Sequence, residues 1–208
     1  DVVTIASTGN ASDFGNLTLA RNQLSACANQ TRGLWGGGDA PAAISDVIDY
    51  VTIASNGDAV DFGNLLQARE NPAACSNSIR GLWASGGTPT VTNVVQYVTI
   101  SSTGNAQDFG DLITGRNFFG SCSNSIRGLF GAGWASPSTT KLNSIEFVTI
   151  ATTGNAMDFG DLTVERRAGQ GTCSSPIRGV FAGGQGGPSD ALLNTIDCVE
   201  LVSTGNAV

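Results

Sequence analysis

Histidine is absent from this 208-residue sequence, and tyrosine occurs only at positions 50 and 97. Without an imidazole the chain has no Ser-His-Asp or Cys-His catalytic arrangement, and no zinc or copper site with histidine ligands. Tyr50 and Tyr97 occupy one position of an internal repeat, so neither is expected to act as a catalytic nucleophile. We therefore predict a protein that is not an enzyme.

Charge is also scarce. Charged residues make up 13% of the chain, with 10 Lys and Arg against 17 Asp and Glu, for a formal net charge of −7. This balance disfavours binding to a nucleic-acid backbone or to an anionic membrane surface. No apolar run approaches the ~18 residues that a transmembrane helix requires. The sequence therefore predicts partners other than nucleic acid, and no membrane insertion.

A repeated segment organises the rest of the chain. Residues 27–38 read Cys-Ala-Asn-Gln-Thr-Arg-Gly-Leu-Trp-Gly-Gly-Gly, and related segments begin at Cys75, Cys122 and Cys173. The intervals of 47 to 51 residues between these copies are typical of propellers, solenoids or other repeat arrays. Abundant glycine (28 residues) and the lack of strong helix-forming runs favour β-structure.

Each repeat divides into four apolar stretches separated by turn signals. In the first complete copy these stretches are residues 24–28, 33–36, 47–54 and 61–66, and Asn56-Gly57 marks the hairpin between the last two. The third stretch is apolar on both faces, as expected for a strand that is covered on both sides. Four short strands per repeat predict an all-β fold, a β-propeller with four-stranded blades.

The pattern resembles the kelch repeat. Arg21 is followed by a small-apolar strand, a polar turn, a second strand and the doublet Gly37-Gly38, and later copies begin at Arg69, Arg116 and Arg166. The last hairpin departs from kelch repeats, because Gly-Asn-Ala-x-Asp-Phe-Gly replaces their Tyr and Trp. This variant is similar to repeats of tail-fibre and other virion proteins of tailed bacteriophages. The resemblance implies a kelch-like propeller in a virion or extracellular setting.

We expect one propeller region over residues 1–208. Its repeats are approximately 1–21 (partial), 22–69, 70–116, 117–166 and 167–208 (partial). The first 21 residues are expected to form the third and fourth strands of a blade. Pairing of the two ends would complete a fourth blade but leave one third strand over. The alternatives are a longer array with a larger ring, or a surplus strand that pairs with another protomer, because an unpaired strand edge promotes association.

The first four cysteines occupy one repeat position. Equivalent positions of neighbouring blades are expected to lie roughly 8–11 Å apart, too far for disulfide bonds. We predict buried free thiols at Cys27, Cys75, Cys122 and Cys173, with a ring of metal-binding thiolates as the alternative. Cys198 stands where other repeats carry an aromatic residue, so it is interpreted as a core substitution.

Arginine and aspartate also recur by position, and we predict structural roles for both. The arginines are Arg21, Arg69, Arg116 and Arg166 in one row and Arg32, Arg80, Arg127 and Arg178 in the other. The Asp-Phe-Gly aspartates, predicted to accept turn amides or pair with these arginines, are Asp13, Asp61, Asp108 and Asp158. An arginine ring for an anionic sugar or phosphate is the alternative. No cofactor is predicted; calcium on the pairs Asp108/Asp111 and Asp158/Asp161 remains an alternative.

Trp134 and Lys141 differ from the repeated residues because they lie in a loop that varies among the copies. Variable loops on a repeat scaffold often carry binding specificity, so these two residues are the candidate binding residues. The alternative is that Trp134 caps the apolar floor of its own blade. We predict a non-catalytic structural or binding module of a phage virion, with virion proteins, other subunits or a host-surface glycan as partner. A secreted or cell-surface propeller that binds glycans and an intracellular kelch-type scaffold are the alternatives.

Overall fold

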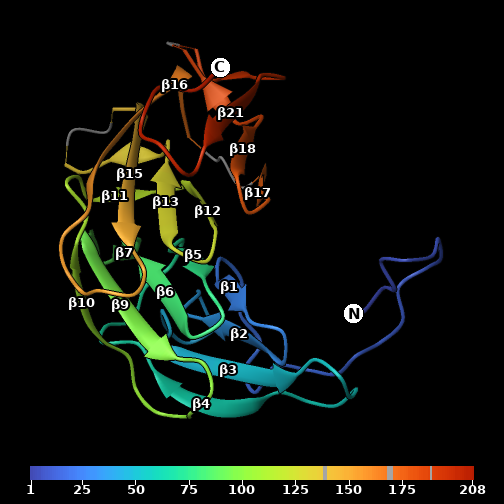
Figure 1. Cartoon of the computed structure of the whole chain (residues 1–208). Helices are drawn as coiled ribbons and strands as arrows, with labels where there is room; N and C mark the ends of the chain where they lie inside the picture. The colour runs from blue at the N-terminus through green and yellow to red at the C-terminus, as the bar shows by residue number, and fades with distance from the viewer. Residues whose placement is uncertain (138–139, 168–170, 188) are drawn as a thin grey trace.

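The computed structural model describes residues 1–137, 140–167, 171–187 and 189–208. Regular structure in these ranges consists of β-strands alone, arranged in antiparallel sheets that form a four-bladed β-propeller (Figure 1). The all-β propeller expected from the repeat is confirmed. No helix suited to spanning a membrane occurs among the described residues.

Each blade begins with an inner hairpin and adds strands outward. The first blade consists of β1 (Ser25–Ala28), β2 (Arg32–Gly36), β3 (Val47–Thr52) and β4 (Val60–Asn64). The second consists of β5 (Ala73–Ser76), β6 (Arg80–Ala84), β9 (Val94–Thr99) and β10 (Gln107–Asp111). The third consists of β12 (Gly120–Ser123), β13 (Arg127–Gly131), β15 (Leu142–Thr149) and β16 (Met157–Arg167).

The fourth blade is a three-stranded sheet of β17 (Gly171–Ser174), β18 (Arg178–Ala182) and β21 (Ile196–Glu200). Beyond β21, the backbones of Cys198 and Val208 exchange hydrogen bonds of 2.9 and 3.1 Å, as the first residue of a fourth strand would. The two-residue strands outside the blade hairpins are β7 (Gly87–Thr88), β8 (Thr90–Val91), β11 (Arg116–Asn117), β14 (Trp134–Ala135), β19 (Gln185–Gly186) and β20 (Ala191–Leu192).

An asparagine closes the inner hairpin of the first three blades. In the second blade, Asn77 Oδ1 accepts the backbone N–H groups of Ile79 and Arg80 at 2.9 and 2.8 Å. This side-chain bond replaces a backbone turn contact and explains why a polar residue follows each inner strand. The fourth blade closes the same turn with the hydroxyl of Ser175.

The glycine of Asp-Phe-Gly produces both a bulge and a close approach between blades. In β10 the register with β9 shifts between Asp108 and Gly110. Gly110 has φ +141°, and a Cβ at this position would come 2.5 Å from the carbonyl oxygen of Gly154 in the next blade. Glycine is therefore required here for its conformation and for its small size.

The hydrophobic core lies between successive blades. Phe109 of the second blade clusters with Val148, Ile150 and Ala156 of the third blade, and it meets the ring of Tyr97 edge-on at 5.8 Å. Phe62 packs in the same way between the first and second blades, and Phe159 does so between the third and fourth. Each blade therefore depends on its neighbour to cover its apolar face, as in other repeat proteins.

The repeated cysteine packs against the glycine of Arg-Gly in the following blade. A Cβ on Gly81, Gly128 or Gly179 would come 2.6 Å from the sulfur of Cys27, Cys75 or Cys122, respectively. We call this contact, with the packing around it, a blade junction. The cysteines are free thiols, as predicted, but Cys173 is exposed rather than buried because no following blade covers it.

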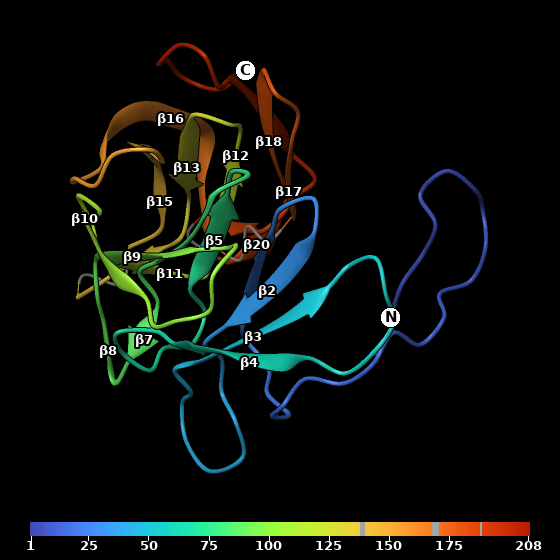
Figure 2. The same cartoon turned by 60° about the horizontal axis from the view of Figure 1, so that its bottom comes forward.

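Among the residues that the structure describes, the first and last blades do not form a junction with each other. The nearest atoms to a Cβ on Gly33 belong to Trp35 and Val51, not to Cys173. The expected strands in the first 21 residues reduce to a single bridge between Val2 and Ser12. The start of this segment loops away from the first blade (Figure 2), whereas Phe14 and Asn16 accept backbone hydrogen bonds from Gly57 and Ala59 of that blade.

Candidate functional site: the loop face

One end of every blade carries its variable loops. In the first blade Ser25 pairs with Gly36, Gly36 with Ile48, and Ile48 with Gly63. The end of the second strand and the start of the third therefore lie beside the linker to the next blade. We call this end of the propeller the loop face; its described loops comprise residues 37–46, 85–93, 132–137, 140–141, 183–187 and 189–195.

Trp134 and Lys141 lie together on the loop face. Trp134 belongs to β14, which pairs with β11, and it forms a backbone bridge with Lys141. The guanidinium carbon of Arg167 lies 4.5 Å from the centroid of the Trp134 ring, a cation–π arrangement. The indole is half-buried, and its Nε1 is buried without a hydrogen-bond partner in the described part of the chain.

Lys141 connects the third blade to the loop of the fourth. Its Nζ donates to the carbonyl oxygen of Gly187 and lies 2.7 Å from Oδ1 of Asp190. The other carboxylate oxygen of Asp190 lies 3.4 Å from Nη2 of Arg167. The hydrogen bond from Lys141, with the charges of Lys141 and Arg167, lowers the pKa of Asp190. We call Trp134, Lys141, Arg167 and Asp190 the loop cluster.

Sequence reasoning identified two members of the loop cluster and missed Arg167 and Asp190. A signal existed for Arg167, since it is the arginine that falls outside both repeated rows. Asp190 lies in a loop whose sequence differs from those of the other repeats, so no sequence pattern indicated its partners.

Two hollows open on the loop face beside the blades. One, of about 450 Å³, is lined by polar or small residues: Gln67, Thr90, Thr92, Asn93, Gly115 and Ser136, together with Val91. The other, of about 500 Å³, lies at the first blade between residues 20–22 and 39–43. The first is suited to a hydrophilic group such as a sugar, whereas the second combines Arg21, Asn22 and Asp39 with alanine and proline side chains.

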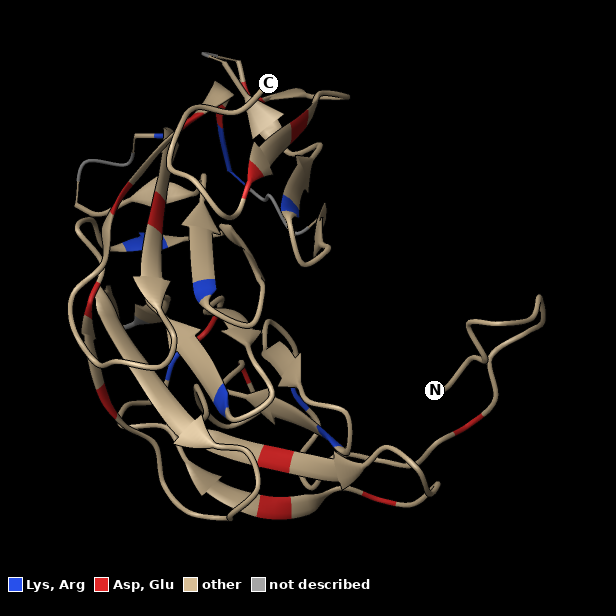
Figure 3. Ribbon diagram, viewed as in Figure 1, with Lys and Arg blue, Asp and Glu red and all other residues tan. Residues whose placement is uncertain are grey.

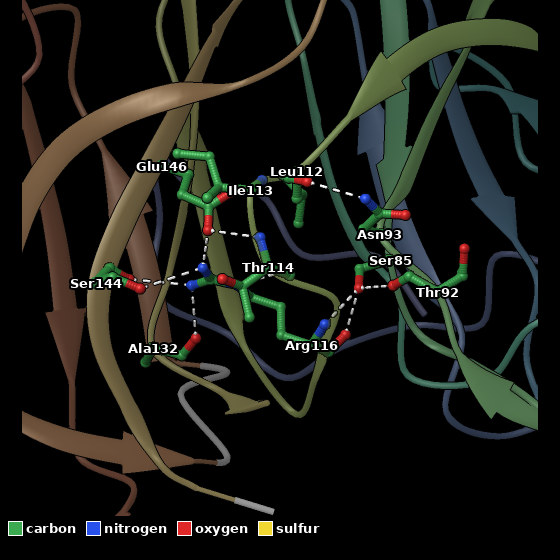
Figure 4. A network of polar contacts seen from close by, with 10 residues as sticks. All are labelled: Ser85, Thr92, Asn93, Leu112, Ile113, Thr114, Arg116, Ala132, Ser144 and Glu146. Carbon is green, nitrogen blue, oxygen red and sulfur yellow. Dashed lines mark hydrogen bonds and ion pairs between the residues drawn. The ribbon is translucent and has the colours of Figure 1, made fainter. Parts of the chain in front are cut away.

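The first arginine row supports the loop face from within. Arg116 is fully buried, and its Nη1 donates to the carbonyl oxygens of Ala132 and Ser144, each at 3.0 Å. Its Nη2 pairs with Glu146 (Figure 4). Glu146 also accepts the backbone N–H of Ile113 at 2.7 Å. One arginine thus joins the linker of one blade to two strands of the next.

The partners of this row are acids on the third strand rather than the Asp-Phe-Gly aspartates. Nη2 of Arg21 lies 3.0 Å from Oδ2 of Asp49, and Arg166 pairs with Asp197. The expected aspartate partners at positions 13, 61, 108 and 158 are all exposed. The acids on the third strand were missed, although a carboxylate in an otherwise apolar strand was a usable signal.

The second blade departs from this arrangement. Gln96 stands at the position of Asp49, Glu146 and Asp197, opposite the second-strand aromatic. Arg69 donates to the carbonyl oxygens of Ser85 and Val94, but among the described residues it has no carboxylate partner. Burial lowers the pKa of Arg69 to about 10.

The second arginine row crosses the blade junctions. Arg80 donates to the carbonyl oxygen of Ile150 in the next blade at 2.9 Å, and its guanidinium carbon lies 4.5 Å from the Tyr97 ring centroid. Arg32 and Arg127 repeat this arrangement. Arg178 instead pairs with Glu200 at 3.2 Å, since no other blade of the described residues packs against this side of the fourth blade. Figure 3 shows the basic residues spread over the blades.

No cluster of three or more metal-ligating Cys, Asp or Glu side chains occurs in the described ranges. The carboxylates of Asp108 and Asp158 point away from the core, since both residues are exposed. Calcium binding at these positions stays a prediction, and the positions of the described carboxylates lend it no support.

Comparison with known proteins finds no family model that matches the chain and no curated protein that is detectably similar to it. The class of protein is therefore given by the fold: a four-bladed β-propeller with blades joined through repeated cysteine, glycine and arginine contacts.

Proposed function

We propose that this chain is a non-catalytic structural and binding propeller, and that it serves as a virion-associated module, such as a tail fibre or receptor-binding component, of a tailed phage. The kelch-like pattern and the likeness to phage repeats support the setting. The loop face is the binding surface, and its ligand is a host-surface glycan or another virion protein.

The loop cluster is the observation that carries this proposal. Arg32, Arg80 and Arg127 and the first three repeated cysteines are engaged between blades. The loop cluster, by contrast, has no repeated counterparts. Arg167 holds the indole against one side, and Asp190 holds both cations in place. An aromatic ring beside ordered polar groups is suited to stacking on a sugar ring while the polar groups contact its hydroxyls.

A glycan array tests the binding role. The full chain is expected to bind a subset of glycans, and Trp134→Ala should weaken binding by about tenfold or more, equivalent to about 1.4 kcal/mol. Ile79→Ala is the matched control, because Ile79 is exposed in an inner-hairpin turn at the opposite end of its blade. Equal binding by the Trp134→Ala protein, or no glycan binding at all, contradicts this role.

Mass spectrometry of purified particles tests the setting. Peptides of this chain are expected in tailed-phage virions and depleted from the soluble fraction of infected cells. Their presence in cells without any in virions contradicts the phage assignment.

A second function is favoured by one observation. The five cysteines are unpaired, and three of them are buried, which fits a reducing compartment better than a secreted protein. An intracellular protein-interaction scaffold of the kelch type is therefore the second candidate. It predicts that affinity capture from cells recovers a partner whose binding is lost in Trp134→Ala.

A further inference from the structure

The first and fourth blades each carry one side of a blade junction, and in neither case does another blade of the chain supply the opposite side. Inside the chain the junction occurs between the first and second, second and third, and third and fourth blades. Each time, the leading blade supplies a cysteine and an arginine, and the following blade supplies a glycine and a buried aliphatic side chain. The first blade keeps an unused following half, and the fourth keeps an unused leading half.

The unused half on the first blade is an apolar groove. Gly33, Trp35, Val51 and Ile53, which we call the blade-1 face, line a hollow of about 680 Å³. Ile53 is 44% exposed, whereas the residues at its position in the other blades, Ile100, Ile150 and Leu201, are 0% exposed. The same position is therefore buried wherever a preceding blade is present.

The fourth blade carries the residue types that pack against such a groove at the internal junctions. These residues, which we call the blade-4 face, are Cys173, Arg178, Ile196 and Cys198. Ile196 is 67% exposed, whereas Ile48, Val95 and Ile145 at the same position are 0% exposed. Cys173 is exposed, and the side chain of Arg178 is free of the carbonyl contact that Arg32, Arg80 and Arg127 make.

We infer that the blade-4 face of one copy of this chain docks onto the blade-1 face of a second copy, continuing the blade junction from chain to chain. The occupant is a second copy because this chain already binds the same two surfaces together three times within itself. The contact places Cys173 against Gly33, Arg178 at the carbonyl oxygen of Ile53, and both exposed isoleucines out of water. Such a contact is heterologous, so two copies can form a closed ring and further copies a chain.

The second copy also supplies the missing fourth strand of the fourth blade. Gly57 and Ala59 donate backbone hydrogen bonds of 2.8 Å to the carbonyl oxygens of Phe14 and Asn16. Gly104 and Ala106 make the same bonds to Phe62 and Asn64, the latter the last residue of β4. Residues 12–16 therefore already lie where the outer strand of a preceding blade belongs.

The strand pairing in the docked state follows from the register inside the chain. Tyr50 pairs with Val60 in the first blade, and Phe147 pairs with Met157 in the third. The equivalent pair across the interface is Cys198 with Ser12, so Ser12 of the second copy exchanges its bridge with Val2 for one with Cys198 and replaces Val208 there. An unpaired sheet edge is thereby completed by strand addition.

The contact between copies is weaker than the junctions within the chain. Ser76, Ser123 and Ser174 each donate a hydroxyl hydrogen bond back to the preceding blade, but the first blade carries Ala28 at this position. Asn29, Asn77 and Asn124 each donate an amide bond to the following blade, but the fourth blade carries Ser175. Association is therefore reversible and depends on concentration. It does not depend on the ligand of the loop face, so failure of glycan binding leaves it intact.

Native mass spectrometry and light scattering of the full chain test the association. We expect two or more copies at high protein concentration, and monomers for Ile53→Asp and for Ile196→Asp, with unchanged circular dichroism. An equimolar mixture of the two variants should form a mixed dimer, because each retains the half that the other lacks. Ile126→Asp, which replaces an isoleucine that is 60% exposed in a turn, should associate normally.

Cross-linking decides between a second copy and closure of one chain. Under mild oxidation, the Ser12→Cys variant is expected to form an intermolecular disulfide between the introduced thiol and Cys198, which the additional change Cys198→Ser abolishes. A chain that stays monomeric at high concentration overturns the inference. So does a disulfide between the introduced thiol and Cys198 of the same chain, and so does a mixture of the two isoleucine variants that fails to associate.

Discussion

The sulfur of Cys75 lies against the backbone of Gly128 in the next blade, so closely that a methyl group on the glycine would come 2.6 Å from it. Burial raises the pKa of the Cys75 thiol, and the nearby Cys27 and Cys122 raise it further. A buried neutral thiol of this kind is a packing group rather than a nucleophile or a metal ligand. The cysteine and glycine of the repeat therefore define the spacing of the blades.

Gly128→Ala is expected to destabilise the fold by about 1–3 kcal/mol, because the added methyl group overfills a packed contact. Gly128 has no positive φ, so backbone strain does not contribute. Thermal or urea unfolding measures the loss. Combining Gly128→Ala with Cys75→Ala should cost less than the sum of the two single changes, since the clash disappears. Gly9→Ala, with no atom within 4 Å of its Cβ position, is the neutral control; additive losses contradict the contact.

Gln96→Glu is expected to stabilise the protein by about 1–3 kcal/mol, because it gives the buried Arg69 the carboxylate that Arg116 already has. The new carboxylate can still accept the N–H of Leu66, now 2.6 Å from Gln96 Oε1. For a chain of this size the melting temperature should rise by about 2–4 °C per kcal/mol. The reverse change, Glu146→Gln, should cost about 3 kcal/mol by leaving Arg116 without its partner. A lower melting temperature for Gln96→Glu argues against the equivalence of the two sites.

Stability is expected to fall as pH rises from 9 to 10. Burial raises the pKa of the Cys27 and Cys75 thiols, and raises that of Cys122 to about 12, from an ordinary value of 9.0. Above pH 9 the unfolded chain releases these protons while the folded chain retains them, so unfolding becomes more favourable, by up to about 1.4 kcal/mol per pH unit for each thiol. The lowered pKa of Arg69 begins to act in the opposite direction as the pH approaches 10, but one arginine offsets only part of the effect of three thiols.

Urea unfolding at several pH values measures this slope. Cys122→Ala should lower stability at every pH because it opens a cavity, and it should also flatten the slope because one titrating group is removed. A slope unchanged by Cys122→Ala contradicts the assignment of the raised pKa to this thiol.

The blade architecture could be predicted from the sequence because each strand is specified locally. The turn at Asn56-Gly57, the apolar third stretch and the repeat length together defined four strands per blade, and the observed β3 and β4 lie within one or two residues of the expected ranges.

Contacts between blades could not be read from local pattern. Glu146 lies 30 residues after Arg116 in the sequence, and their pairing depends on how the third blade is placed on the linker that leaves the second. The exposure of Cys173 depends on whether the last blade meets the first, which is set by the angle between blades. The loop cluster depends on the paths of two loops that differ in sequence. The sequence indicated Arg167 only weakly, by its position outside both repeated arginine rows.

Restoring the two absent polar groups should strengthen the association between copies. Ala28→Ser provides the hydroxyl that Ser76, Ser123 and Ser174 use at the internal junctions, and Ser175→Asn provides the amide that Asn29, Asn77 and Asn124 use. Two added hydrogen bonds of about 0.5–1.5 kcal/mol each correspond to roughly a tenfold or greater fall in the dissociation constant. Sedimentation at a series of concentrations measures it. Ala28 contributes only backbone groups to its internal junction with Ser76, and an asparagine at position 175 can close the turn that Ser175 closes, so the melting temperature of dilute monomer should stay the same. Adding Ile196→Asp should cancel the gain, and tighter association that survives Ile196→Asp would place the interface elsewhere.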